Sequence, residues 1–191
     1  MSAPDFRLPP SLVPDVVAKA RGIRVTGSYF RALPTGYPLD VALPMKPYTG
    51  YDRRGSVPGI VHGLYLASDP KTTMFEVWSP VRDRWQKKDL HAVNVDVSNV
   101  FDIRDLAVTP WIDRDCFRLG HPPSPGHRNY AAWHYVAYAI WSAGFNGVIW
   151  KSQRYAGDVL CVYDLDKRSF VRKGKLLDRA IRPDDWLKKN P

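Results

Sequence analysis

The stretch GLYLASDPKTTMFEVW, residues 63–78, contains the transition that organises the fold. It begins with a short apolar run typical of a buried strand and continues into Ser68, Asp69 and Pro70. Serine and aspartate are favoured N-cap residues and proline is favoured in the first helical turn, so these residues predict a helix start. Glu76 lies beyond that first turn among large apolar residues. The stretch therefore predicts a strand followed by a helix that carries a partly buried acid.

The remaining pattern predicts an α+β protein built around a sheet. β-branched and aromatic residues favour strands, and apolar residues around most of a segment favour a central helix. A helix is expected within residues 130–145, ending at Gly144, and a short helix is expected before Gly22. Strands are expected over residues 23–32, where Gly27 is a candidate break, and over residues 62–68, 91–103, 147–152 and 159–165.

Size and charge limit the classes of function. A chain of 191 residues and 21.8 kDa suits one domain. Its net charge of +9 favours anionic partners, and much of this charge lies in residues 167–189, which we expect to be a solvated face or tail. No helix-turn-helix, zinc-finger or aromatic RNA-binding signature is visible, so direct nucleic-acid binding is not expected.

The first residues lack the pattern of a secretory signal, and the most apolar segment is too short and too polar to cross a bilayer. Cys116 and Cys161 are far apart, which suits reduced thiols. We therefore expect a cytoplasmic protein with no membrane association. His121, His127 and His134 do not have zinc-ligand spacing, so no metal is expected. No G-x-G-x-x-G follows a strand, which argues against a Rossmann dinucleotide site.

Several polar residues have ordinary interpretations by position alone. Arg31 lies near the end of the first expected strand, and Arg54 lies in an irregular Pro-, Gly- and Tyr-rich segment, residues 33–59. Arginines in such places are commonly solvated, although long ordered loops are usually functional. Tyr65 in a strand is commonly a core residue, and Ser152 after a strand is commonly a turn residue.

Three segments together resemble the RES domain, a family named for an arginine, a glutamate and a serine and known as the toxin half of bacterial toxin–antitoxin pairs. The segments are YFRA, RRGSVPGIVHGLYLASDPKTTMFEVW and SAGFNGVIWKSQR. The resemblance identifies Arg31, Glu76 and Ser152 as the three named residues. It runs from about Gly22 to Asp164. In the loop where many members carry Gly-Arg-Trp-Asn-x-Pro-Gly, this chain has RRGSVPG, without the Trp and Asn.

The resemblance implies a single domain with an ADP-ribosyltransferase-like mixed sheet core and flanking helices. It divides the chain into an N-terminal arm (residues 1–21), the RES domain (22–165) and a basic C-terminal extension (166–191). It also implies an enzyme that cleaves the nicotinamide–ribose bond of NAD+, passing ADP-ribose to water or to a protein. NAD+ would be a substrate, and no cofactor is expected.

The resemblance also implies site roles and a partner. Glu76 would stabilise positive charge on the ribose, and Arg31 and Arg54 would bind the pyrophosphate through bidentate hydrogen bonds. Tyr65 would face the nicotinamide or ribose. Ser152 would bind the ligand or position the carboxylate. A cognate helix-turn-helix antitoxin of the Xre type would neutralise the toxin. The alternative is a non-catalytic basic module that binds nucleic acid or an acidic protein. The sequence leaves monomer and homodimer open.

Overall fold

The structure, a computed structural model, describes residues 17–41, 57, 60–77, 86–104, 131–152 and 154–191. Within residues 131–135 it describes the backbone alone. Arg54, Cys116, His121 and His127 lie outside the described residues, as do most of the N-terminal arm and most of residues 33–59. The predictions made for those residues stay predictions.

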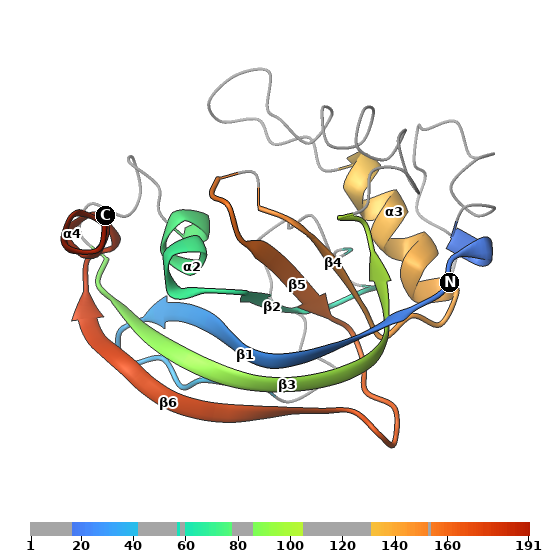
Figure 1. Cartoon of the computed structure of the whole chain (residues 1–191), viewed down its shortest axis with the longest axis horizontal. Coiled ribbons are helices and arrows are strands. Elements are labelled where there is room, and N and C mark those ends of the chain that lie inside the picture. Colours follow the sequence, from blue (N-terminus) through green and yellow to red (C-terminus); the bar gives the residue numbers. More distant parts are fainter. Residues whose placement is uncertain (1–16, 42–56, 58–59, 78–85, 105–130, 153) are drawn as a thin grey trace.

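Six strands form one mixed sheet in the order β1-β2-β5-β4-β3-β6 (Figure 1). Parallel pairing joins β3 to β4, and the other neighbours are antiparallel. The strands are β1 (Ile23–Pro34), β2 (Leu64–Ala67), β3 (Lys88–Asp102), β4 (Gly147–Lys151), β5 (Asp158–Val162) and β6 (Phe170–Ile181).

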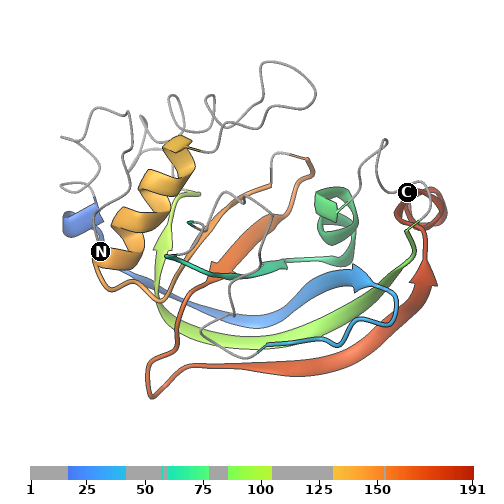
Figure 2. The ribbon, with the colours of Figure 1, turned by 180° about the vertical axis from the view of Figure 1, so that it is seen from behind.

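The sheet curls because β1 also pairs with β3 along almost its whole length. The pairings β1–β2, β2–β5, β5–β4, β4–β3 and β3–β1 then form a closed circuit of five strands. The β1–β2 contact in that circuit is the single pair Phe30↔Ala67. In Figure 1 the long strands β1, β3 and β6 form one curved layer beneath β2, β4 and β5. Figure 2, from behind, shows β6 as the outermost strand of that layer.

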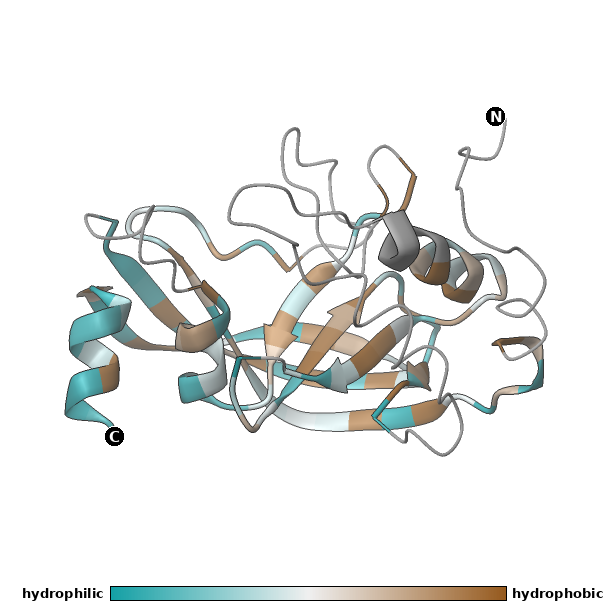
Figure 3. Ribbon diagram, turned by 90° about the horizontal axis from the view of Figure 1, so that it is seen from above, coloured by the Kyte–Doolittle hydropathy of each residue, from teal (hydrophilic) through white to brown (hydrophobic). Residues whose placement is uncertain are grey.

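Within the described ranges, the longer helices that flank the sheet are α2 (Pro70–Val77), α3 (Ala131–Ser142) and α4 (Pro183–Lys189). The short expected N-terminal helix is represented by a helical turn at residues 17–19. α2 and α4 lie together at one end of the molecule, and α3 lies at the other end (Figure 1). Figure 3 shows the described side-chain region of α3 as mainly hydrophobic and α4 as mainly hydrophilic. The α+β class with a mixed sheet and flanking helices is confirmed.

Three apolar clusters hold these elements together. One lies inside the strand circuit and includes Val95, Leu160 and Val162. A second packs α3 against the other face of β4 and β5, and a third joins α2 and α4 to β1 and β3 around the fully buried Met74. Strand alternation sends successive side chains into different clusters, which is why both faces of β4 and β5 are apolar.

One expectation about local structure is corrected, and another is confirmed in part. Gly27 does not break β1, because pairing with β3 continues from Val25 to Pro34. Gly27 has a φ of +124°, which glycine adopts without steric penalty, so the strand passes through this position. The basic segment, expected to be a solvated face or tail, forms a solvated face and not a tail: β6 pairs with β3 without burying any of its residues, and α4 contributes Trp186 and Leu187 to the cluster around Met74.

Candidate functional site

Asp69 lies immediately before α2 and caps its first turn. Its Oδ1 accepts from the backbone N–H of Thr72 at 2.7 Å, and its Oδ2 accepts from the Thr72 hydroxyl at 2.6 Å. The Ser68 hydroxyl also lies 3.0 Å from Asp69 Oδ2. This is the expected N-cap, in which a carboxylate satisfies amide groups that the helix leaves without partners. The cap fixes where α2 starts and hence where Glu76, near its other end, stands.

The turn between β4 and β5, residues 152–157, packs against that helix start. The Ser152 N–H donates to the Gly157 carbonyl at 2.8 Å, which closes the turn. A Cβ at Gly157 would lie 2.1 Å from Thr72 Oγ1 and 2.2 Å from Asp69 Oδ2. Only a residue without a side chain allows this approach, because real Cβ contacts are never so short. Gly157 therefore lets the turn sit directly on the cap of α2.

Glu76 and Ser152 meet directly at the other end of this contact. The Ser152 hydroxyl donates to Glu76 Oε1 at 2.6 Å, and both side chains are half-buried. The same Ser152 oxygen accepts from the backbone N–H groups of Arg154 and Tyr155, each at 3.1 Å. With its acceptor positions used by two amides, the hydroxyl proton points at the carboxylate. The structure thus brings together two of the residues that the sequence singles out.

Arg154 and Tyr155 fasten the same turn to α2. The Arg154 guanidinium donates to the Phe75 carbonyl at 3.1 Å and to the Glu76 carbonyl at 3.5 Å. The rings of Tyr155 and Phe75 stack with centroids 4.9 Å apart and an interplanar angle of 11°, and Lys71 Nζ lies 5.1 Å from the centroid of the Tyr155 ring. Arg154 thus holds the backbone at Glu76, and Tyr155 packs against the side chain of the preceding residue. Sequence reasoning missed them, although they come two and three residues after the serine that it selected.

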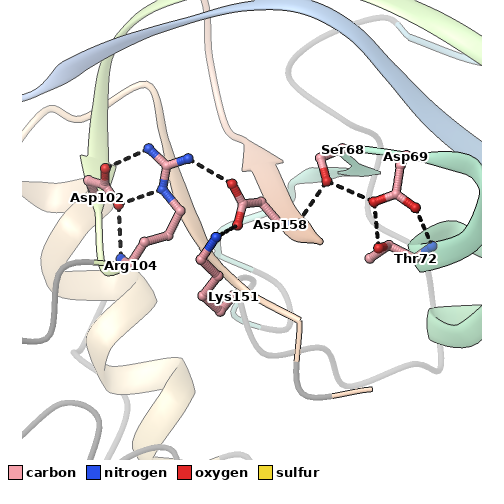
Figure 4. A network of polar contacts seen from close by, with 7 residues as sticks. All are labelled: Ser68, Asp69, Thr72, Asp102, Arg104, Lys151 and Asp158. Atoms are coloured by element: carbon pink, nitrogen blue, oxygen red, sulfur yellow. Dashed lines mark hydrogen bonds and ion pairs between the residues drawn. The ribbon is translucent and has the colours of Figure 1, made fainter. Parts of the chain in front are cut away.

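A charged network supports the base of the turn (Figure 4). Arg104 binds both oxygens of Asp102 and reaches Asp158 Oδ2 at 2.7 Å, and Lys151 Nζ lies 2.8 Å from Asp158 Oδ1. The Asp158 N–H donates to the Ser68 hydroxyl at 2.9 Å, which links this network to the cap of α2. The network therefore joins the ends of β3, β4 and β5 to the start of the helix.

Electrostatics in this network favour the charged forms. Burial works to raise the pKa of Asp102, but hydrogen bonds from Arg104 and its positive charge lower the pKa overall. The pKa of Arg104 is raised, first by its hydrogen bonds to Asp102. Charges that are paired and hydrogen-bonded in this way remain ionised, which keeps the network intact around neutral pH.

Arg31 lies on β1 directly across from His91 on β3. Strand alternation places Arg31 on the face of β1 that also carries Tyr29 and Leu33, both part of the cluster inside the circuit. The neighbouring residue, Ala32, faces the other way and packs with Met74 of α2. The structure therefore places Arg31 on the face of β1 opposite the one that packs against α2. Its action on the same ligand as Glu76 stays a prediction.

Tyr65 lies on β2, half-buried, with its ring 6.2 Å from that of Trp150 in an edge-on arrangement. Trp150 lies on β4, two residues before Ser152, which follows the end of that strand. The Tyr65 ring also packs against the cluster under α3, as expected for an aromatic core residue.

Among the residues that the structure describes, no group of three or more His, Cys, Asp or Glu side chains could hold a metal ion. Cys161 is buried inside the cluster under α3. No helix within the described ranges is long and apolar enough to span a membrane.

The RES domain family matches residues 30–184, which is most of the chain. The protein belongs to the RES domain family. The match includes Arg31, Glu76 and Ser152, and it extends through β6 into the start of α4. The expected membership is confirmed. No curated protein matches the chain.

A solved structure shares the fold of this RES domain. A chain in the crystal structure of the M. tuberculosis MbcT-MbcA toxin-antitoxin complex superposes with a TM-score of 0.64. The alignment covers 92% of the present chain and 95% of that chain, at 16% sequence identity. At this identity the likeness establishes the common fold, including the sheet and helices that position Glu76 and Ser152.

Proposed function

We propose that this RES-domain protein is an NAD+-consuming toxin that cleaves the bond between nicotinamide and ribose. The observation that carries the proposal is the 2.6 Å hydrogen bond from Ser152 to Glu76 in a chain of this family. A carboxylate held at a fixed position suits a reaction in which positive charge develops on the sugar. NAD+ is the substrate in this proposal, and the protein's own side chains supply the chemistry.

The reaction expels neutral nicotinamide and leaves an oxocarbenium-like ribose, as in other glycosyl transfers. Glu76 would stabilise that charge, because its attraction to the sugar grows as the bond breaks. Ser152 occupies Oε1, so we assign Oε2 to a ribose hydroxyl. Arg31 and Arg54 would bind the pyrophosphate, and the Tyr65 ring would contact the nicotinamide or ribose. The electrons of the broken bond leave with nicotinamide. An oxygen or nitrogen of water or a protein side chain then bonds to the ribose carbon and loses a proton to solvent.

Purified wild-type and Glu76→Gln proteins are incubated with NAD+, and free nicotinamide and free ADP-ribose are followed separately. We expect wild type to release nicotinamide and Glu76→Gln to lose this activity, because the substitution removes charge while keeping shape. Asp164→Asn serves as the matched control, since Asp164 is an exposed acid beyond the far end of β5, outside the turn. Equal amounts of both products indicate hydrolysis, whereas nicotinamide without free ADP-ribose indicates transfer to protein.

A toxin of this kind requires an antitoxin, and we propose a cognate helix-turn-helix protein of the Xre type. Family membership supports this partner, as does the fold shared with a chain from a toxin-antitoxin complex. An antitoxin bound over Glu76 would suppress nicotinamide release in the assay above. Release that continues undiminished in the purified pair would contradict that mode of neutralisation.

A basic binding module is the second candidate function, and the surface of β6 favours it. This strand exposes four basic side chains, Arg172, Lys173, Lys175 and Arg179. Folded wild type that consumes no NAD+, with or without cell extract as acceptor, would move this candidate to first place. Binding to nucleic acid would then weaken steeply with salt, because each neutralised phosphate releases counterions.

A further inference from the structure

His91 stands directly across from Arg31 in the β1–β3 ladder, so the two side chains share one face of the sheet. We propose that His91 Nε2 donates a hydrogen bond to a phosphate oxygen of the bound dinucleotide, beside Arg31. This inference rests on the proposed function, in which Arg31 binds the pyrophosphate. It adds a substrate-binding residue that the sequence did not indicate.

The His91 imidazole carries a buried nitrogen that the described protein groups leave unsatisfied. Its Nε2 atom is buried, and among the described residues it has no hydrogen-bond partner. Buried polar atoms in folded proteins are almost always paired, so a buried nitrogen without a protein partner needs an explanation. A phosphate oxygen is a strong acceptor and supplies the missing partner.

The nearest carboxylate on the same strand does not serve as that partner. Asp89 is two residues before His91, and its oxygens accept from other groups. Oδ1 accepts from the Ala180 N–H at 2.8 Å and from the Thr35 hydroxyl at 3.2 Å, and Oδ2 accepts from the Gly36 N–H at 3.4 Å. Asp89 therefore links β3 to β6 and to the turn after β1. The Nε2 atom of His91 can donate to another acceptor.

The charges around His91 favour a neutral donor. Burial lowers the pKa of the imidazole, Asp89 opposes that shift, and Arg31 lowers the pKa further. On β6 the residue that pairs with His91 is the apolar Leu176. A neutral imidazole carries one N–H donor, which can bind a phosphate without competing with the charge of Arg31. The pair thus combines one permanent cation with one neutral donor, an arrangement suited to a pyrophosphate.

The test measures binding of ADP-ribose, which carries the pyrophosphate but has no nicotinamide group, so it is not cleaved during the measurement. Titration calorimetry compares wild type with His91→Leu, which removes the donor, and His91→Gln, whose amide can replace it. Asn94→Leu is the matched control, because Asn94 is an exposed residue on the opposite face of the same strand. A second measurement follows the side-chain N–H signals of protein labelled with 15N-histidine, and the His91→Gln protein identifies the His91 signal.

We expect His91→Leu to bind ADP-ribose about tenfold more weakly, a change of ~1.4 kcal/mol. His91→Gln should recover part of this loss, and Asn94→Leu should bind like wild type. Inorganic pyrophosphate should compete with ADP-ribose in wild type. The His91 Nε2–H signal should shift when ADP-ribose is added, which a purely structural histidine would not show.

Two results would overturn the inference. One is a folded His91→Leu protein that binds ADP-ribose as tightly as wild type; the other is a His91 signal that does not move at saturating ADP-ribose. If His91→Leu fails to fold, the signal in wild type still decides. Wild type that binds ADP-ribose through His91 but consumes no NAD+ would refute the proposed function and leave this inference standing. Wild type that consumes NAD+, together with a His91→Leu protein that binds ADP-ribose equally tightly, would support the proposed function and refute this inference.

Discussion

The hydroxyl of Ser152 donates to the carboxylate of Glu76 at 2.6 Å although the two residues are 76 positions apart in the chain. Glu76 comes from the end of α2, and Ser152 follows β4. The contact exists because the turn after β4 docks along the whole of α2, from the cap at Asp69 to the carbonyls of Phe75 and Glu76. Activity should therefore depend on residues of the turn as well as on the carboxylate.

Ser152→Ala should lower kcat/KM for NAD+ by about tenfold to a hundredfold. A hydrogen bond to a charged group contributes ~1.5–3 kcal/mol, and each ~1.4 kcal/mol is a factor of ten in rate. The substitution also leaves the N–H groups of Arg154 and Tyr155 without their acceptor, so the melting temperature should fall slightly. Steady-state kinetics and thermal melts check both effects. Ser142→Ala, in the exposed last turn of α3, is the control, and equal kinetics for the two variants would contradict the assigned role.

Arg154→Ala should reduce NAD+ turnover severalfold while changing the free energy of unfolding by less than about 0.5 kcal/mol. Exposed side chains contribute little to global stability, but Arg154 holds the carbonyls next to the Glu76 side chain. Turnover and urea unfolding are measured on the same protein samples. The exposed Arg21 provides a matched Arg21→Ala control. A loss of activity that only parallels a loss of folded protein would show that Arg154 has no positioning role.

Gly157→Ala should destabilise the protein by ~1–3 kcal/mol, the usual range for overpacking. Its new Cβ would fall 2.1 Å from Thr72 Oγ1 and 2.2 Å from Asp69 Oδ2, so the turn must move away from α2. That movement should also separate Ser152 from Glu76 and reduce turnover. Urea unfolding monitored by fluorescence gives the free energy. Ala156→Ser changes the exposed neighbouring residue by a similar volume and should leave both quantities unaltered; equal behaviour of the two variants would argue against close docking.

Stability should fall as the pH drops below about 4 toward 2. Hydrogen bonds from Ala180, Gly36 and Thr35 lower the pKa of Asp89, and hydrogen bonds from Ser98 and Ser169 lower that of Asp166 to about 2. The folded-state pKa values lie below the ordinary value of 3.8, so in acid the unfolded chain binds more protons and protonation favours unfolding.

Urea unfolding at pH 6 and pH 3 measures this linkage. Asp89→Asn should be less stable than wild type at pH 6 and should lose less stability between the two pH values. This smaller loss is expected because the asparagine side chain does not titrate, so the hydrogen bonds at this position no longer depend on an ionised oxygen. A wild-type free energy of unfolding that is equal at pH 6 and pH 3 would contradict the lowered pKa values.

The sequence by itself determined the local elements of this protein. Ser68, Asp69 and Pro70 marked the start of α2 because capping depends on residues a few positions apart, and Asp69 does cap the helix. The same local chemistry identified five of the six strands, all but β6, and the end of α3, where Gly144 has a φ of +83°. The spacing of Arg31, Glu76 and Ser152 within three recognisable segments indicated the family, and the family match confirms it.

Only the tertiary structure decided how those elements meet. The closed strand circuit, the pairing of β6 with β3, and the docking of the β4–β5 turn on α2 all join residues far apart in the chain. The pattern of side chains in the sequence predicts which face of an element is apolar, but it does not predict which apolar faces pack together. Arg154, Gly157 and His91 escaped notice for that reason, because their roles depend on neighbours that local sequence does not name. The carboxylate was visible in the sequence, whereas the contacts that hold it exist only in the folded chain.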